Sequence, residues 1–239
     1  MIFLKIPSKY LHDFPDAMGR TALLFGATGL VGGHCLELLL RDEIHTHVAA
    51  FVRRPLERRH PRLDVHVIDF DRLEEYAGLI AGDDIFCCLG TTIRIAGSQD
   101  AFRRVDFSYP LTIASLGAGN GVGQYLLVSS LGADAGSRFF YTRVKGELER
   151  EMRNVPLRGL HIFRPSLLLG DRREVRPGER IGAVLARVIS PLMVGPLANY
   201  RPIHARDVAA AMIAVAKRDI GGPHVYLPDR IAAIAGGRV

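Results

Sequence analysis

Short apolar runs alternate with segments of helical periodicity along most of this chain. The apolar runs predict buried strands over Thr21–Phe25, His47–Val52, Val65–Asp69, Asp84–Leu89, Gln124–Ser129 and Leu160–Phe163. The periodic segments predict helices over Leu30–Leu40, Arg72–Ala81, Gln99–Gly117 and Arg138–Arg153. Strands that are apolar on both faces and separated by helices are typical of a parallel sheet. Because such crossovers are right-handed, we expect an α/β fold built on a doubly wound parallel sheet.

The regular alternation ends after Arg164. Proline recurs through residues 165–202, which predicts a small irregular region on the substrate side of the sheet. A further helix is predicted over Asp207–Lys217, with Asp207 at its N-cap or in its first turn. The chain is therefore divided into an N-terminal extension, one domain and a loose tail, which cover residues 1–17, 18–227 and 228–239.

The composition is that of a folded domain. Of the 239 residues, 48% are hydrophobic and 23% are charged, which argues against disorder. Lys and Arg number 31 and Asp and Glu 25, so the net charge is +6, a mild excess that does not indicate a histone-like protein. Three cysteines cannot all pair, so we expect a reducing, cytoplasmic location. Cys87 and Cys88 are interpreted as small core residues of a strand.

No targeting segment, membrane span or metal site is predicted. The N-terminus lacks the long apolar core and the cleavage site of a signal peptide. The stretch Ile181–Tyr200 holds one charge, Arg187, and is interrupted by Pro191 and Pro196, so we expect a helix and a loop there. The nine histidines form no metal-binding motif.

A glycine-rich turn joins the first predicted strand to the first predicted helix. Its glycines, Gly26, Gly29 and Gly32, have the spacing G-x-x-G-x-x-G. One glycine permits the tight turn, one lets the backbone approach a pyrophosphate, and one packs the helix against the strand. The N–H groups at the start of the helix would bind the phosphates. Glycine-rich turns are common, but the strand before and the helix after favour a Rossmann-type dinucleotide site.

The end of the second strand indicates which dinucleotide is bound. An NAD-binding strand ends in an acidic residue that accepts the ribose 2′-hydroxyl, whereas this one ends in Arg53 and Arg54, with no carboxylate before Glu57. A guanidinium suits a 2′-phosphate, so we predict NADP(H). The alternatives for residues 53–62 are a solvated basic loop and a nucleic-acid patch, which the absence of aromatic residues disfavours. Asp69 could accept from the adenine amino group or cap the following helix.

Three side chains suggest acid–base chemistry at an oxygen atom. Tyr141 and Lys145 are four residues apart, which places them on one face of the predicted helix. An ammonium beside a phenol favours the phenolate, so the pair can exchange a proton with an alcohol or a carbonyl. Ser129 and Ser130 end the fifth strand at the ligand side of the sheet, and Ser130 is the better candidate to hold a substrate oxygen. The alternatives are a chance Tyr/Lys spacing and turn or cap serines.

These motifs follow one another in the order found in the short-chain dehydrogenase/reductase superfamily. The glycine spacing resembles its extended and atypical branches. Three further strings, Phe86–Thr92 (FCCLGTT), Leu131–Asp134 (LGAD) and Asp171–Glu179 (DRREVRPGE), resemble the Tat-interacting-protein family of atypical short-chain dehydrogenases and its bacterial NAD(P)-binding relatives. The resemblance covers about residues 20–215.

The resemblance implies a set of site residues. It implies that Tyr141 is the proton donor with Lys145 beside it. Arg172 lies past the sixth strand, where it could reach the cofactor or form a surface ion pair. The residues implied to lie along NADPH are Thr28, Gly29, Leu30 and Val31, with Arg53 and Arg54 at the 2′-phosphate and Leu89 and Gly90 beside the ribose.

Two hypotheses for the activity follow. Ser130, Tyr141 and Lys145 favour an NADPH-dependent reductase of a small carbonyl compound. The alternative is a non-catalytic NADP(H)-sensing regulatory or assembly protein, because members of the resembled family are often known as such. In addition, Asp106 stands where many superfamily members carry an Asn of a proton relay, and an Asp would place a charge near the site. A homodimer is expected by analogy alone.

Overall fold

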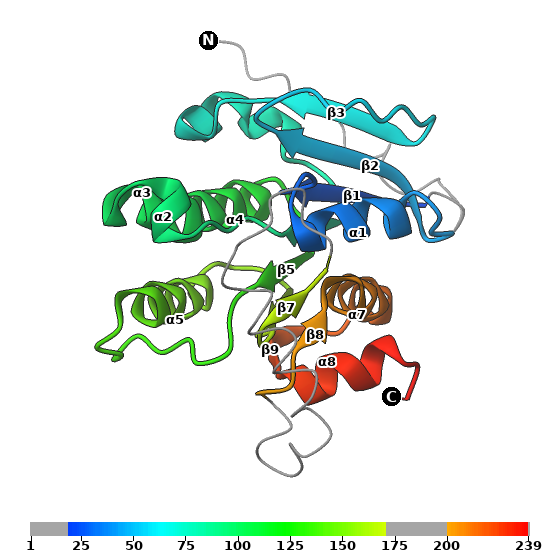
Figure 1. Ribbon diagram of the computed structural model, residues 1–239. Helices are drawn as coiled ribbons and strands as arrows, with labels where there is room; N and C mark the ends of the chain where they lie inside the picture. Colours follow the sequence, from blue (N-terminus) through cyan, green and yellow to red (C-terminus); the bar gives the residue numbers. More distant parts are fainter. Residues whose placement is uncertain (1–18, 171–199, 239) are drawn as a thin grey trace.

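The predicted parallel sheet is present, and a computed structural model describes residues 19–170 and 200–238 of the chain. The predictions for Arg172 and for the rest of residues 171–199 lie outside these residues. The strands run in the order β3-β2-β1-β4-β5-β6-β9, all parallel (Figure 1). Their bounds are β1 Arg20–Phe25, β2 His45–Val52, β3 Leu63–Val67, β4 Asp84–Cys87, β5 Gln124–Val128, β6 Gly159–Phe163 and β9 Gly222–Tyr226.

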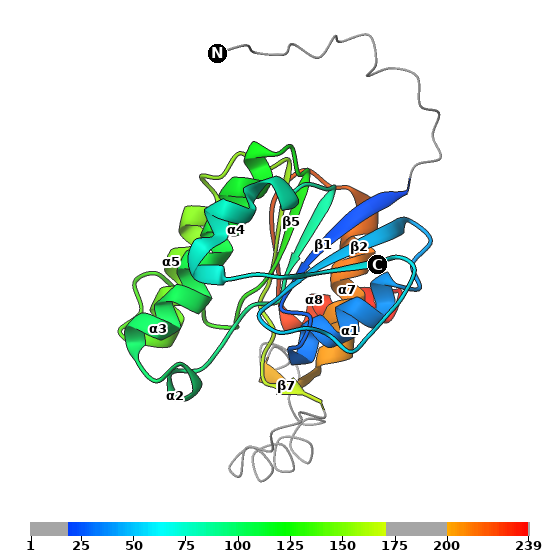
Figure 2. The ribbon, with the colours of Figure 1, turned by 90° about the horizontal axis from the view of Figure 1, so that it is seen from above.

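Helices cover both faces of the sheet (Figures 1 and 2). One layer holds α1 (Leu30–Leu39), α7 (Ala205–Arg218) and α8 (Pro228–Ala235). The other layer holds the 3₁₀ helix η2 (Phe70–Leu79), α4 (Tyr109–Gly119) and α5 (Phe140–Met152). The short helices α2 (Ile93–Ala96) and α3 (Gln99–Arg103) and the π-helix η3 (Arg104–Ser108) lead into α4.

The two helix layers explain why the inner strands, such as β1, are apolar on both faces. Successive side chains of a strand point to opposite faces of the sheet. In β1, Ala22 and Leu24 pack toward α1 and α7, while Leu23 and Phe25 pack toward the other layer, and all four are fully buried. An apolar side chain is therefore required at every position, which is the pattern of a parallel sheet covered on both sides.

The point where the strand order reverses lies beside β1. This strand pairs with β2 on one side and with β4 on the other. Phe25, its last residue, is in register with Phe51 of β2 and Cys87 of β4. The carboxyl ends of the three strands are therefore level, and ligands of open α/β sheets bind at such a switch point.

The C-terminal part is more regular than the sequence indicates. The prediction that residues 228–239 form a loose tail is wrong, because α8 buries Ile231 and Ile234 and packs against α7. The edge strand β9 was not predicted, since Pro223 and the half-exposed positions of an edge strand weaken the apolar pattern. Within the region predicted to be irregular, β7 (Leu168–Leu169) forms a strand that pairs with β8 (Ile203–His204), which directly follows that region.

Two predicted helices have different local geometry. The helix predicted over Arg72–Ala81 is a 3₁₀ helix that begins at Phe70, and the helix predicted over Gln99–Gly117 is divided by the π-helical turn η3. Asp207 lies in the first turn of α7, as predicted. Among the helices of the described residues, none is both long and apolar enough to cross a membrane.

A buried polar network lies where the strands begin, at the end of the sheet opposite the glycine turn. The His45 ring bonds to Asp42 at 2.7 Å and to Asp84 at 2.9 Å, and the Gln124 amide donates to Asp84 at 2.6 Å. Gln124 also bonds to His161 at 3.2 Å. Burial lowers the pKa of His161 to about 4, so this ring is neutral at physiological pH. The network stabilises the sheet at the edge away from the glycine turn.

Candidate functional site

The carboxyl ends of four strands bring the predicted site residues to one edge of the sheet. Gly26 follows β1, Arg53 follows β2, Leu89 follows the end of β4, and Ser130 follows the end of β5. Parallel strands in register end at the same edge. Residues that are far apart in the sequence, such as Gly26 and Ser130, therefore lie at the same end of the sheet.

The glycine turn lies so close to β4 and α1 that side chains would not fit. Gly26 has a φ of 90°, and a Cβ there would lie 2.7 Å from the carbonyl oxygen of Cys88. A Cβ on Gly32 would lie 2.0 Å from the carbonyl oxygen of Gly26. The Gly29 N–H donates to that same oxygen at 2.9 Å. The glycines therefore permit the turn and the close approach of α1, as the sequence predicts.

The N-terminus of α1 has the properties of an anion site. Its N-cap, Gly29, has no side chain to accept the free N–H groups, and the first turn holds no acidic residue. Thr28 and Gly29 are exposed, Leu30 is half-buried, and Val31 and Gly32 are buried. The N–H groups and the positive end of the helix dipole thus remain available, and they fit the pyrophosphate of a dinucleotide.

The arginines after β2 divide into two kinds. Arg58 pairs with Glu37 at 2.6 Å, and Arg62 donates to the Asp42 carbonyl at 2.7 Å. Arg53, Arg54 and Arg59 are exposed and have no ion pair or hydrogen bond with the residues described. Of these three, Arg53 and Arg54 come directly after β2, beside the glycine turn, and are therefore the ones placed to meet an anionic ligand there.

Asp69 serves as a helix cap. Its carboxylate accepts from the Asp71 N–H at 3.0 Å and so caps η2. Of the two roles that the sequence left open, the structure shows the cap. Leu89 and Gly90 continue from β4, and Gly90 is exposed.

Tyr141 and Lys145 lie on one face of α5, at different depths. Tyr141 is in the first turn and is 37% exposed, and its ring contacts that of Phe102 at a centroid distance of 5.6 Å. The Lys145 side chain is only 4% exposed. The phenol is therefore open to a ligand, while the ammonium below it is enclosed.

Asp106 holds the Lys145 ammonium inside the protein. Its carboxylate, 1% exposed, lies 2.8 Å from Lys145 Nζ and accepts from the Thr91 N–H, also at 2.8 Å. Burial acts to lower the pKa of Lys145, but the charges of Asp106 and Tyr141 outweigh burial and raise it. Lys145 is therefore a cation with one N–H used by Asp106, which leaves the other two of its three donors.

The two serines after β5 have different partners. The Ser129 hydroxyl is buried and donates to Glu149 at 2.5 Å, and Glu149 also binds Arg164 through two N–H groups. The Ser130 hydroxyl is half-buried, and among the residues described its one hydrogen bond is a long one of 3.3 Å to the Leu131 carbonyl. Ser130 is therefore the serine whose hydroxyl is more available to a ligand.

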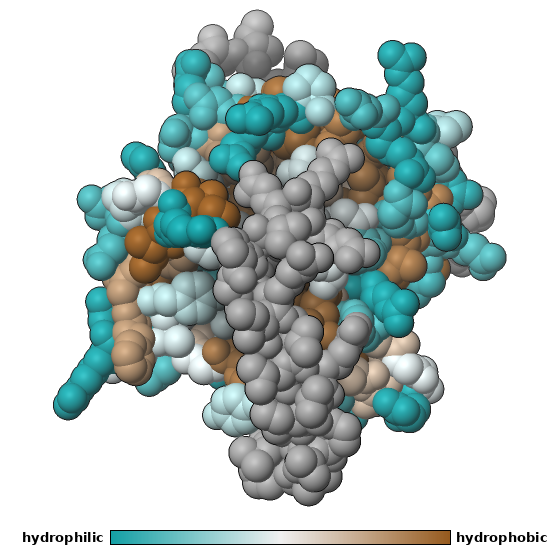
Figure 3. All heavy atoms as spheres, in the orientation of Figure 1, coloured by the Kyte–Doolittle hydropathy of each residue, from teal (hydrophilic) through white to brown (hydrophobic). Residues whose placement is uncertain are grey.

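Exposed apolar side chains flank the start of α5. Phe139, two residues before Tyr141, is 78% exposed. Ile93 and Ile95 are exposed on α2, which leads into the helix that carries Phe102, and this apolar patch is brown over α2 in Figure 3. An apolar surface of this kind beside polar groups is common at ligand sites.

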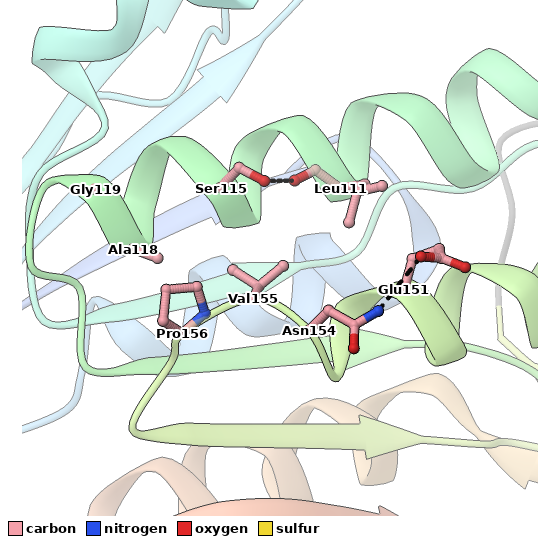
Figure 4. Close-up of a pocket in the computed structure, with 8 residues that line it drawn as sticks. All are labelled: Leu111, Ser115, Ala118, Gly119, Glu151, Asn154, Val155 and Pro156. Carbon is pink, nitrogen blue, oxygen red and sulfur yellow. Dashed lines mark hydrogen bonds between the residues drawn. The ribbon is translucent and has the colours of Figure 1, made fainter.

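A groove of about 440 Å³ lies away from this site, between α4 and the turn after α5 (Figure 4). Its lining includes Leu111 and Ser115 of α4, with Val155 and Pro156 after α5. Tyr141 is ten residues before Glu151 of the groove, which is about 15 Å along a helix.

Within the two described ranges, no group of three or more His, Cys, Asp or Glu side chains is placed to hold a metal ion.

The parallel sheet and the glycine turn at its switch point are those of an NAD(P)-binding protein with a Rossmann-type fold. The chain belongs to the family described as NAD(P)H-binding, whose model matches residues 26–166. It is 41% identical to the protein HTATIP2 of Rattus norvegicus over 175 residues, which are 72% of each chain. The resemblance to the Tat-interacting-protein family is thereby confirmed.

Further comparisons bear on the fold and on the location. The structure of the Bordetella bronchiseptica enzyme WbmH in complex with NAD+ matches with a TM-score of 0.66 at 14% identity, over 88% of this chain and 76% of that one, which shows the fold. The FMP52 protein of Candida albicans is 27% identical over 223 residues, 90% of this chain and 95% of that protein. It and other fungal relatives are named mitochondrial proteins. The expectation of a cytoplasmic location is contradicted by these relatives.

Sequence reasoning missed two parts of the site. One is the ion pair of Asp106 with Lys145, since the two residues lie on different elements and the pair depends on how those elements pack. The other is Glu149, which lies four residues after Lys145 on the same helical face, so that the spacing Tyr141-Lys145-Glu149 offered a signal. A carboxylate on the same face, which accepts from Ser129, could have been predicted from that spacing.

Proposed function

We propose that this protein is an NADPH-dependent reductase of carbonyl compounds. The observation that carries the proposal is the open phenol of Tyr141 above the enclosed, cationic Lys145, at the edge of the sheet that also holds the glycine turn. Membership of an NAD(P)H-binding family supports the nicotinamide cofactor.

Each side chain has one task in this reaction. The Ser130 hydroxyl donates a hydrogen bond to the carbonyl oxygen and orients it. Tyr141 transfers its phenolic proton to that oxygen as the carbonyl becomes an alcohol. The two N–H groups of Lys145 that Asp106 leaves unused would hold the nicotinamide ribose. When bound, the reduced nicotinamide supplies the hydride, and Ile93, Ile95 and Phe139 offer apolar contacts for the rest of the substrate.

The test is NADPH oxidation over a panel of aldehydes and ketones with the wild type and Tyr141→Phe. We expect the wild type to turn over at least one substrate class, and the variant to lose about 10²- to 10⁴-fold in rate because the proton donor is gone. Its NADPH dissociation constant should be unchanged. Tyr109→Phe is the control, since this phenol bonds to Asp71 on another helix. Equal background rates in wild type and Tyr141→Phe would contradict the reductase and favour the NADP(H)-sensing alternative.

We further propose that Arg53 and Arg54 select NADPH over NADH. They follow β2 directly, and both are free of partners within the described residues, whereas Arg58 is paired. A hydrogen bond to a charged group contributes about 1.5–3 kcal/mol, or about 10- to 100-fold in affinity. Arg53→Gln should therefore weaken NADPH by this factor and NADH by less than about twofold.

Fluorescence titration of both cofactors measures this selectivity. The matched control is Arg58→Gln, which removes the same charge from the same loop but from an arginine that Glu37 already holds. We expect this control to change neither affinity by more than about twofold. Equal losses of NADPH and NADH affinity in Arg53→Gln would show that the arginine does not contact the 2′-phosphate.

A further inference from the structure

Two of the three cysteines of the chain are in contact beside the glycine turn. Cys35 lies in α1 and is fully buried, whereas Cys88 comes directly after β4 and is half-buried. Their Sγ atoms are 3.8 Å apart, although the two residues are 53 positions apart in the sequence. A disulfide bond of about 2.05 Å would form if the two sulfurs came about 1.8 Å closer.

The third cysteine is kept out of this contact by the alternation of side chains along the strand. Cys87 ends β4 and belongs to the core on the side of α4 and α5. Cys35 and Cys88 pack in the core on the side of α1 and α7. Because successive side chains of a strand point to opposite faces, Cys87 faces away from Cys35. The chain therefore offers one pair of thiols that can be joined, and Cys87 remains a core residue.

The glycine turn lies between the two segments that carry this pair. A Cβ on Gly26 would lie 2.7 Å from the Cys88 carbonyl oxygen, and a Cβ on Gly32 of α1 would lie 2.0 Å from the Gly26 carbonyl oxygen. The Cys88 N–H also donates to the Phe25 carbonyl at 2.8 Å, which ties this residue to the end of β1. In an interior packed this closely, α1 and the segment of Cys88 cannot approach each other without displacing the turn between them.

We propose that Cys35 and Cys88 form a reversible disulfide that weakens the binding of the nicotinamide cofactor at the glycine turn. The bond draws α1 toward the end of β4, and the N–H groups of α1 that fit the pyrophosphate move with the helix. The oxidant is a small-molecule disulfide such as oxidised glutathione. The inference rests on the cofactor site of the proposed function and not on the reduction of a carbonyl.

The exchange has two steps. The Cys88 thiolate attacks one sulfur of oxidised glutathione, which breaks the S–S bond, releases one glutathione thiolate and leaves a mixed disulfide on Cys88. The Cys35 thiolate then attacks the Cys88 sulfur and releases the second glutathione thiolate. The two protons of the protein thiols pass to the two glutathione thiolates. The protein thus loses two electrons, and one glutathione disulfide is reduced to two thiols.

The exchange is expected to be slow. The hydrogen bond with Cys35 and burial both raise the pKa of the Cys88 thiol. Since the thiolate is the nucleophile, we expect equilibration at neutral pH to take on the order of hours. The pair would therefore respond to a lasting change in the redox state of its surroundings.

The first measurement is the redox state of the pair. The wild type, Cys87→Ala and Cys35→Ala are equilibrated with glutathione buffers of graded ratio, the free thiols are alkylated, and the peptides are identified by mass spectrometry. We expect a disulfide between Cys35 and Cys88 in the wild type and in Cys87→Ala, and no such bond in Cys35→Ala. A bond between Cys87 and Cys88 in the wild type would overturn the proposal, and so would the absence of any disulfide within the chain in the most oxidising buffer.

The second measurement is the affinity for NADPH in the same buffers. We expect the oxidised wild type and the oxidised Cys87→Ala to bind NADPH about tenfold more weakly than their reduced forms. Cys35→Ala should bind it equally well in both states. An oxidised wild type that binds NADPH as tightly as the reduced protein, or more tightly, would overturn the proposal even if the disulfide forms.

Reciprocity gives a further check that uses only the wild type. If the disulfide weakens NADPH binding tenfold, saturating NADPH must make the disulfide tenfold harder to form. This corresponds to a rise of about 30 mV in the reduction potential of the pair. An unchanged potential would contradict the coupling.

These measurements separate the inference from the proposed reductase, because none of them requires turnover. If the disulfide forms and weakens NADPH binding while no carbonyl is reduced, the inference is confirmed and the reductase is wrong. If carbonyls are reduced but the oxidised and reduced proteins bind NADPH equally well, the reductase is confirmed and the inference is wrong.

Discussion

Replacing Gly32 with alanine is expected to weaken NAD(P)H binding by about 100-fold or more, which corresponds to roughly 2.7 kcal/mol. The new Cβ would lie 2.0 Å from the Gly26 carbonyl oxygen and 2.7 Å from its carbon. Both are backbone atoms, so no side-chain rotation can relieve the clash. The first turn of α1 would have to move away from the glycine turn, and the N–H groups that fit the pyrophosphate would move with it. Titration with NADPH and NADH measures the loss.

Gly33→Ala is the matched control. This neighbouring glycine is in the same helix, and a Cβ there would meet only the Ala27 carbonyl oxygen, at an ordinary 3.6 Å. Cofactor affinity should be unchanged, and the free energy of unfolding should rise by up to about 1 kcal/mol, because alanine is the better helix former. If Gly32→Ala binds NAD(P)H as well as Gly33→Ala does, the cofactor does not depend on the approach of α1 to the turn.

Asp106→Ala is expected to lower the free energy of unfolding by about 3–5 kcal/mol. The substitution leaves the Lys145 ammonium enclosed without a counter-charge, and it also leaves the Thr91 N–H without its acceptor. Removing one member of a buried ion pair costs far more than the pair itself contributes, because the remaining charge is not solvated. Urea unfolding followed by circular dichroism measures the change.

Two further variants test whether the uncompensated Lys145 charge causes this loss of stability. Glu147→Ala breaks the neighbouring pair with Arg103, whose side chain is 42% exposed, and should cost about 1 kcal/mol or less. Adding Lys145→Met to Asp106→Ala removes the stranded charge and should restore part of the lost stability. If Asp106→Ala costs no more than Glu147→Ala, the Lys145 charge is not enclosed as described.

Much of the fold could be predicted because it depends on local patterns. Continuous apolar runs such as the one at Thr21–Phe25 are needed in any strand that is covered on both faces, and they mark the inner strands among the residues described. The edge strand β3 was also predicted, although two of its five residues are exposed. The strand β9 was not predicted because it begins with Gly222 and Pro223, which weaken the pattern of a strand. The helix α8 was not predicted. It is short, and it buries its apolar residues, Ile231 and Ile234, where it packs against α7.

The candidate site was predictable in its parts. The glycine spacing, the arginines after the second strand and the Tyr141–Lys145 spacing are each short-range patterns, and the structure brings them to one edge of the sheet. The role of Asp69 could not be decided from sequence, because an Asp before a helix serves equally as a cap and as a ligand. The sequence also could not decide which of the two serines keeps its hydroxyl available to a ligand, because this depends on the contacts of Ser129 and Ser130.

The sequence by itself therefore determined the parallel sheet, the glycine turn and the face of the helix that carries Tyr141 and Lys145. These features depend on residue types at fixed short spacings, and backbone geometry converts such spacings into faces and turns. Only the tertiary structure decided that a carboxylate meets Lys145. Asp106 is 39 residues from Lys145 and reaches it through a π-helical turn and the packing of η3 against α5. A contact of that kind depends on how whole elements pack, and no local spacing encodes it.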